Sequence, residues 1–186
     1  MGSSRRKFTK EFKEEAIRRL ELGASLAEVA RQVGLELALP AVQKGIDLAL
    51  EADADDLTTV PGQGLLLHEL VSNLVDNAIR YTPVGGSVLL QVGRAGDDVT
   101  LAVSDSGPGI AAGDVDKVFM PFYRAQATLE ANPGGTGLGL AIVRDIANLH
   151  GAGITLGQSG DGHGLSVRVI FPTPAIVEAS SALKAN

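Results

Sequence analysis

His68-Glu-Leu-Val-Ser-Asn-Leu-Val-Asp-Asn-Ala-Ile-Arg-Tyr-Thr-Pro83 is the stretch that decides the fold of this chain. It belongs to a helix that the hydrophobic spacing predicts over residues 65–81, with one apolar face made of Leu67, Leu70, Val71, Leu74 and Ala78. A second stripe beside that face carries Glu69, Asn73, Asn77 and Arg80. Asparagine is a poor former of helix interiors, so two asparagines on one stripe need an explanation.

Two interpretations of this polar stripe stay open from the residues alone. It is either a solvated helix face or a site for a hard cation and a phosphate. The second interpretation rests on chemistry, because amide and carboxylate oxygens suit Mg²⁺ and a guanidinium group suits phosphate.

The two predicted strands after this helix place the carboxylate of Asp105 on the side that faces the core. Residues 87–92 and 98–104 are predicted as a pair of strands, and Val99, Leu101 and Val103 share one face of the second strand. Asp105 continues the same alternation. Burying a carboxylate without a partner costs several kcal/mol, so Asp105 should meet a specific donor, for which a purine amino group is one candidate. Residues 106–110, Ser-Gly-Pro-Gly-Ile, then allow close approach of the backbone.

A glycine repeat leads into the second clear helix. Gly134-Gly-Thr-Gly-Leu-Gly139 precedes an amphipathic run over 140–150, and two further strands are predicted at 154–156 and 165–171. Backbone amides at a helix N-terminus bind anions, so a nucleotide phosphate is indicated here. The glycines give G-x-G-x-G rather than the dinucleotide-binding G-x-G-x-x-G, and no lysine follows them as in a Walker-type phosphate loop.

Composition excludes several classes of protein. The chain has 186 residues, of which 45% are hydrophobic, and no run approaches the roughly 18 apolar residues of a membrane span. It has no cysteine, so disulfides and thiolate zinc sites are excluded, and its three histidines are scattered. Residues 37–186 hold eight basic and sixteen acidic side chains, which argues against a sequence-independent nucleic-acid binder.

The first 36 residues differ in character, with eight basic against six acidic side chains. A helix is predicted over 9–22, with Phe12, Ala16 and Leu20 on one stripe, and a second short helix from the cap Ser25 to Gly34. Residues 5–34 resemble the opening of the helix-turn-helix of small insertion-sequence transposase proteins. Residues 35–40, Leu-Glu-Leu-Ala-Leu-Pro, carry no side chains for base edges where a groove-reading helix should follow. Residues 40–45 are predicted as a separate helical turn before a strand that begins near residue 46.

Four motifs in this order resemble those of the catalytic ATP-binding domain of sensor histidine kinases, in the superfamily of gyrase-type and chaperone ATPases. The helix at 68–83 matches the asparagine box, 105–110 the first glycine box, 119–124 the phenylalanine box and 135–140 the second glycine box. The resemblance implies an α/β (α+β) two-layer sandwich with helices on one face of a mixed sheet and an ATP lid over about 111–137. The expected domains are a short helical leader at 1–36, the ATP-binding domain at 37–174 and a tail at 175–186.

The resemblance also implies roles for the residues at the nucleotide. Asn73 and Asn77 would hold Mg²⁺ and the phosphates, Arg80 would touch phosphate and Tyr81 would flank the adenine. Asp105 would accept from the adenine amino group. The pocket around it would be shaped by Gly107, Gly109 and Ile110.

Further roles fall on the lid and on the terminal phosphate. Arg124 would reach that phosphate, and Glu69 occupies the position at which gyrase-type relatives keep a water-activating base. The lid residues expected to close on the triphosphate are Gly135, Thr136, Gly137, Leu138, Gly139 and Leu140. Residues 125–135 are expected to become ordered when nucleotide binds.

The implied activity is transfer of the terminal phosphate of ATP, with Mg²⁺, to a histidine on a separate phosphoacceptor domain, and indirectly to a response regulator. The resemblance places the domain in the cytoplasm, under a membrane-anchored parent kinase, with no membrane contact by this chain. We do not expect this chain to phosphorylate itself, because His68 belongs to the asparagine box and His150 and His163 are expected at the surface or in packing. The alternatives are a serine kinase of the anti-sigma type, a nucleotide-binding fragment without turnover, and a DNA-binding regulator with an ATP-sensing domain.

Overall fold

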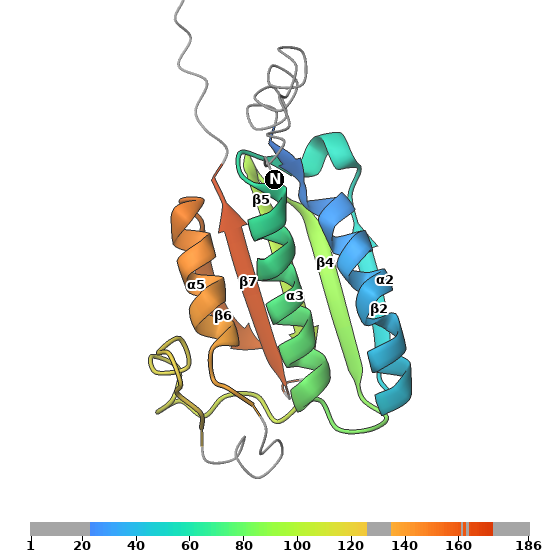
Figure 1. Ribbon diagram of the computed structural model, residues 1–186, viewed down its shortest axis with the longest axis vertical. Helices are drawn as coiled ribbons and strands as arrows, with labels where there is room; N and C mark the ends of the chain where they lie inside the picture. Colours follow the sequence, from blue (N-terminus) through green and yellow to red (C-terminus); the bar gives the residue numbers. More distant parts are fainter. Residues whose placement is uncertain (1–22, 126–134, 161, 163, 173–186) are drawn as a thin grey trace, which may run out of the picture.

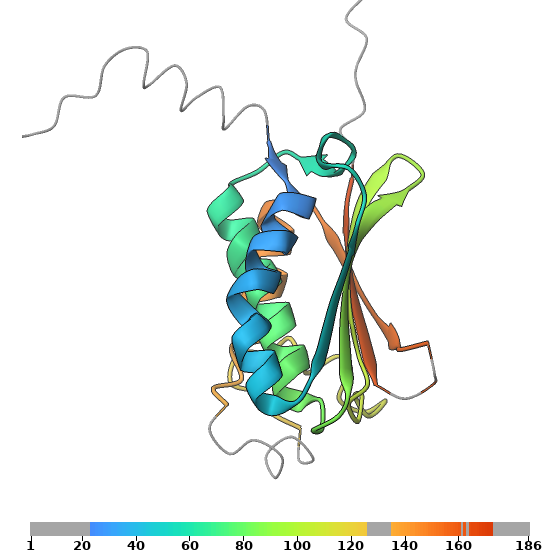
Figure 2. The ribbon, with the colours of Figure 1, turned by 90° about the vertical axis from the view of Figure 1, so that its right-hand side faces the viewer.

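A computed structural model describes residues 23–125, 135–160, 162 and 164–172. Three helices cover one face of a five-stranded sheet (Figures 1 and 2). The helices are α2 (Leu26–Lys44), α3 (Gly64–Tyr81) and α5 (Gly139–Leu149). The sheet contains β2 (Asp47–Ala52), β4 (Ser87–Ala95), β5 (Asp98–Asp105), β6 (Gly153–Gln158) and β7 (Leu165–Phe171). This arrangement confirms the predicted two-layer α/β sandwich. No helix among the described residues is long and apolar enough to cross a membrane.

The sheet is mixed, with strand order β2-β4-β5-β7-β6. β2 runs parallel to β4, and the other neighbouring strands are antiparallel. The predicted alternation of β5 is confirmed, since Val99, Leu101, Val103 and Asp105 are all buried. Asp105 is the last residue of β5 and stands opposite Val88 of β4, so the sheet fixes its carboxylate at one end of the core.

The helix α3 packs along the middle of the sheet. Its observed bounds, Gly64–Tyr81, agree with the predicted helix, and all five side chains of the predicted apolar face are buried. Val75 and Ile79 are buried as well, which widens that face. The polar stripe of α3 is thereby left to one side of the contact between helix and sheet.

The helix α2 corrects the prediction for residues 25–45. It does not end at Gly34, and residues 40–45 are not a separate turn, because the helix is continuous from Leu26 to Lys44 with Pro40 inside it. Proline inside a helix costs about 3 kcal/mol. That cost is offset by burial of one continuous apolar face, formed by Leu26, Ala27, Val29, Ala30, Val33 and Ala41. The true end is Gly45, whose φ of 70° is a left-handed conformation that favours glycine.

The expected domain boundary after residue 36 therefore falls inside one helix. Residues 26–33 belong to the same core as α3 and the sheet. The predicted leader helix at 9–22 lies outside the described residues, as do the tail at 175–186 and His163.

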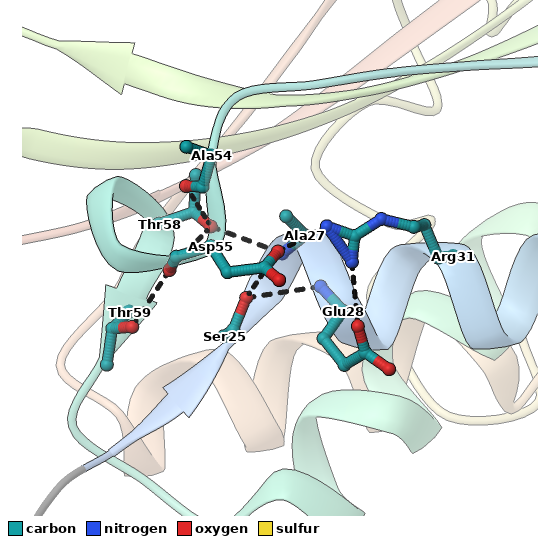
Figure 3. A network of polar contacts seen from close by, with 8 residues as sticks. All are labelled: Ser25, Ala27, Glu28, Arg31, Ala54, Asp55, Thr58 and Thr59. Carbon is teal, nitrogen blue, oxygen red and sulfur yellow. Dashed lines mark hydrogen bonds and ion pairs between the residues drawn. The ribbon is translucent and has the colours of Figure 1, made fainter.

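A polar network fixes the amino end of α2 (Figure 3). Ser25 Oγ accepts a hydrogen bond from Glu28 N at 3.2 Å, which confirms the predicted cap, and it donates to Asp55 Oδ1. Thr58 Oγ1 accepts from Ala27 N at 3.4 Å. These partners come from the short helix η1 (Asp55–Thr58), which is followed by β3 (Thr59–Val60). β3 pairs with β1 (Ala24–Ser25), so the start of α2 is held from two sides.

Candidate functional site

A cavity of about 390 Å³ opens between α3, the end of β5 and the start of α5. Of the predicted site residues, those that line it are Asn73, Asn77, Arg80, Tyr81, Asp105, Gly109, Ile110, Arg124, Gly135, Thr136, Gly137, Gly139 and Leu140. Glu69, Gly107 and Leu138 do not line it but adjoin residues that do. The four motifs, which are spread over some seventy residues of sequence, thus meet at one place.

Asp105 is the most deeply placed polar group of the cavity, with 7% of its surface exposed. Its Oδ1 accepts hydrogen bonds from Gly107 N at 2.8 Å and from Leu165 N at 3.2 Å. Within the described part of the chain, Oδ2 receives no hydrogen bond. Burial raises the pKa of the Asp105 carboxyl, and the two backbone amides oppose that rise. The carboxylate therefore keeps one oxygen for a ligand that can donate.

The side chains of Asn73 and Asn77 on α3 lie next to Gly139, the first residue of α5. A Cβ atom added to Gly139 would stand 2.8 Å from Asn77 Nδ2, 3.2 Å from Asn77 Oδ1 and 3.3 Å from Asn73 Oδ1. The Asn73 side chain is oriented by Glu69, because Asn73 Nδ2 donates to Glu69 Oε1 at 2.9 Å and to Glu69 O at 2.8 Å. Two amide oxygens are consequently gathered beside a backbone that carries no side chain.

The cationic side of the cavity contains Arg80 and Arg124. Arg80 Nη2 donates to Asp76 Oδ2 at 2.9 Å, one turn back on α3. A Cβ atom at Gly135 would stand 3.5 Å from Arg124 Nη2 and 3.5 Å from Tyr81 Oη. The glycine repeat therefore passes close to one of the cations and to the tyrosine of α3.

Gly137 joins the glycine repeat to the phenylalanine box. Its φ is 71°, and a Cβ atom there would stand 2.8 Å from the backbone of both Phe122 and Tyr123. Phe122 N donates to Gly137 O at 2.9 Å. Any larger residue at position 137 would force these two segments apart. The helix α5 begins directly after them, and among the described residues no side chain caps its amino end.

Sequence reasoning missed Asp76, Asp114 and Tyr123, which also line the cavity. Tyr123 Oη donates to Asp114 Oδ1 at 2.7 Å, and that hydrogen bond, with a smaller contribution from burial, raises the pKa of Tyr123. Asp76 was detectable, because it lies four residues before Arg80 on the same helix. The Asp114 contact was not, since it depends on the path of a loop.

The two described histidines do not line the cavity. His68 Nε2 lies 2.9 Å from Glu36 Oε2, between α3 and α2. His150 Nδ1 lies 2.8 Å from Ile146 O, and its ring meets Phe171 edge-on at a centroid distance of 6.3 Å. The contacts of His150 agree with the surface or packing role predicted for it. Residues 126–134 of the expected lid lie outside the described residues.

Comparisons with known proteins agree with this geometry. A sequence model of the family described as histidine kinase-, DNA gyrase B- and HSP90-like ATPase matches residues 62–175, and one described as transposase matches residues 3–39. The sensor protein kinase PmrB of Pseudomonas aeruginosa is 44% identical over 113 residues, which are 61% of this chain and 23% of PmrB. The chain thus spans about a quarter of that relative.

Solved structures give the same result. The catalytic domain of histidine kinase ThkA superposes with a TM-score of 0.69 at 29% identity, over 80% of this chain and 95% of that domain. Full-length ShkA in complex with AMPPNP superposes with a TM-score of 0.67 at 25% identity, over 90% of this chain and 40% of ShkA.

Proposed function

Because this chain belongs to the family of histidine kinase-, DNA gyrase B- and HSP90-like ATPases, we propose that its cavity binds ATP with Mg²⁺ and that it transfers the terminal phosphate to a histidine of a separate phosphoacceptor domain. The chain carries the ATP-binding catalytic domain of a sensor histidine kinase. The observation that carries the proposal is the buried Asp105 carboxylate, with Oδ1 satisfied by two amides and Oδ2 left for a donor.

The adenine end of the cavity combines this carboxylate with apolar walls. Val103, Val167 and Ile110 line the cavity together with Asp105. A flat apolar ring that carries an amino group matches these walls and this acceptor. Guanine carries an oxygen where adenine carries the 6-amino group, so it would bring an acceptor toward the carboxylate.

The phosphate end combines amides, cations and an open helix terminus. The amide oxygens of Asn73 and Asn77 fit Mg²⁺, which takes few protein ligands and shares its coordination with phosphate and water. Bound there, Mg²⁺ would neutralise charge on the phosphates. Arg80 and Arg124 add cationic contacts, and the uncapped amino end of α5 adds backbone amides and a favourable dipole.

Glu69 fits a supporting role in this scheme. Its carboxylate accepts a hydrogen bond from Asn73 and does not line the cavity. Transfer to an imidazole needs no water-activating base. We therefore assign Glu69 to orienting the Asn73 amide, so that Oδ1 faces the metal and phosphates.

A surface beside the cavity suits a protein substrate. Met120 and Phe122 are 51% and 74% exposed, next to the cavity residue Tyr123. Phe122 has a φ of 64°, which is strained for a bulky residue and holds its position relative to the glycine repeat. An apolar surface at this place would bring the imidazole of a phosphoacceptor domain toward the terminal phosphate.

The test separates binding from transfer. ATP is titrated calorimetrically with and without Mg²⁺, and a phosphoacceptor domain is then incubated with the chain, Mg²⁺ and γ-labelled ATP. We expect Mg²⁺-dependent binding and acid-labile label on the supplied domain, with none on this chain alone. Binding without transfer to any of several such domains would favour a nucleotide-binding fragment without turnover. Absence of ATP binding would overturn the proposal.

The variant Asn77→Asp sharpens this test. It keeps the size and one oxygen but places a negative charge beside the phosphates, so we expect ATP affinity to fall about tenfold. Asn148→Asp makes the same chemical change at an exposed position near the far end of α5 and should leave affinity unchanged. Equal affinities for the two variants would contradict the role given to Asn77.

A further inference from the structure

The last turn of α3 presents several cavity residues and must be held at its carboxyl end. Arg80 and Tyr81 lie in that turn, Asn77 directly precedes it, and all three line the cavity. The final four carbonyls of a helix have no partner within the helix. Thr82 supplies one partner, because its N and its Oγ1 donate to Ala78 O at 3.0 Å and 2.7 Å.

Lys44 supplies hydrogen-bond donors for the next two carbonyls. Its Nζ donates to Ile79 O at 2.8 Å and to Arg80 O at 2.6 Å. Lys44 is the last residue of α2, so the end of one helix is bonded to the end of its neighbour. An ammonium group at a helix carboxyl end also interacts favourably with the helix dipole.

The turns that follow the two helices are bonded to each other as well. Gly85 N donates to Gly45 O at 3.0 Å, and Asp47 N donates to Gly86 O at 3.0 Å. The backbone directly after Lys44 is thereby anchored, and the residues before it belong to α2. Its ammonium group is aimed at the carbonyls of α3 by a rigid support rather than by a flexible loop.

The surroundings of the Lys44 ammonium group disfavour its positive charge. Burial, and then the nearby Arg80 guanidinium, lower the pKa of Lys44. A charge kept in such a place needs compensating hydrogen bonds, and the two carbonyls provide them. Arg80 is itself turned toward Asp76, so the two cations use different partners.

We propose that Lys44 is a positioning residue of the nucleotide site, whose ammonium group fixes the last turn of α3 and so holds Arg80 and Tyr81 at the cavity wall. This inference rests on the proposed nucleotide binding. Lys44 does not line the cavity itself and acts through the backbone of residues 79 and 80.

The experiment compares Lys44→Met, Lys44→Arg and Ser25→Ala. Lys44→Met keeps the apolar stem and removes the donors, Lys44→Arg keeps cationic donors, and Ser25→Ala removes a cap at the opposite end of α2. We expect the Kd for Mg-ATP to rise about fivefold in Lys44→Met and to stay within about twofold in Lys44→Arg. Ser25→Ala should lower the melting temperature and leave the Kd unchanged.

Hydrogen exchange without nucleotide gives an independent measurement. Amides 79–82 should exchange faster in Lys44→Met than in the wild type, whereas exchange there should be unchanged in Ser25→Ala. If the wild type binds no ATP, the proposed function fails. The exchange measurement still tests whether Lys44 holds the last turn of α3. Should Lys44→Met not fold, Lys44→Gln replaces it; its shorter side chain keeps a neutral donor but not the ammonium group, so we expect the Kd and the exchange at 79–82 to rise, by less than the rise expected for Lys44→Met. An unchanged Kd, unchanged exchange at 79–82, or an equal loss of affinity in Ser25→Ala would overturn the inference.

Discussion

Two helices of the same layer, α2 and α5, begin in opposite ways. At the amino end of α2, Ser25 and Thr58 accept from the amides of Glu28 and Ala27. At the amino end of α5, no side chain from the described part of the chain caps the helix, and the first residue is a glycine that borders the cavity. Both helices carry the same partial positive charge there. At α2 the backbone amides are satisfied by side chains of the protein, whereas at α5 they are left for a ligand.

The same contrast separates two carboxylates. Asp55 accepts from Ser25 and pairs with Arg31 beside the start of α2 (Figure 3). Asp105 is buried, yet only one of its oxygens is satisfied within the described residues. Polar groups that satisfy one another stabilise the fold, whereas buried groups left open at a cavity cost stability and are retained for binding. Substitutions at the two places should therefore affect different properties.

The largest effect is expected from Asp105→Asn on nucleotide affinity. The amide keeps an oxygen for Gly107 N and Leu165 N but presents its NH₂ group to the amino group of the adenine. Hydrogen bonds to charged groups contribute about 1.5–3 kcal/mol, so ATP affinity should fall ten- to a hundredfold. Calorimetric titration measures this, and the melting temperature without ligand should not fall. Retained ATP affinity would remove Asp105 from the adenine site.

The next effect concerns stability and the amino end of α2. Thr58 is fully buried, and Thr58→Val would leave the Ala27 amide without its acceptor. We expect the free energy of unfolding to fall by about 1 kcal/mol and the ATP affinity to stay unchanged. Thr59→Val makes the same change at the exposed neighbouring residue and should cost less than half as much. Chemical denaturation of both variants checks the difference; equal losses would mean that the buried hydroxyl is not a cap.

The sequence allowed α3 and β5 to be predicted well, because each has a regular period of apolar residues that matches its burial. The site residues were predicted from the resemblance of the four motifs to those of histidine-kinase ATP-binding domains, and most of them line one cavity. The ATP lid over about 111–137 remains a prediction, and its residues 126–134 lie outside the described part of the chain. Tyr123 lies within the phenylalanine box but was given no role, and Asp114 was not predictable, because it belongs to no motif and a loop brings it to the cavity.

The error at α2 has a different physical cause. Gly34 and Pro40 are local signals for the end of a helix, and packing of the apolar face on both sides of them overrode those signals. Residues 25–34 also resemble the second helix of a helix-turn-helix, but the apolar side chains that such a helix would use, Leu26, Val29, Ala30 and Val33, are buried in the core of the ATP-binding domain. One local pattern suits both folds, and only the tertiary contacts decide between them.

A smaller effect is expected in the pH dependence of stability at Asp105. The carboxyl pKa in the folded state is raised above the ordinary value of 3.8. Below that value Asp105 is protonated in both the folded and unfolded states; as the pH rises, the charge forms more readily in the unfolded chain and the wild type loses stability. Asp105→Asn carries no such charge, so its stability relative to the wild type should increase as the pH rises above about 3.8, the ordinary pKa of the carboxyl. Urea denaturation at several pH values measures this, and a constant difference would contradict it.

The smallest effect is expected from Arg31→Met. Arg31 Nη1 donates to Glu28 Oε2 at 2.8 Å, and its other terminal nitrogen pairs with Asp55, but all three side chains are substantially exposed. Exposed ion pairs are screened by water and salt and lose side-chain entropy on forming, so we expect a loss below about 0.5 kcal/mol. That small loss should shrink further in high salt, whereas the loss in Thr58→Val should not. If Arg31→Met instead cost more than Thr58→Val, the charges would hold the start of α2, and the contrast with the open end of α5 would rest on ion pairs rather than on satisfied backbone amides.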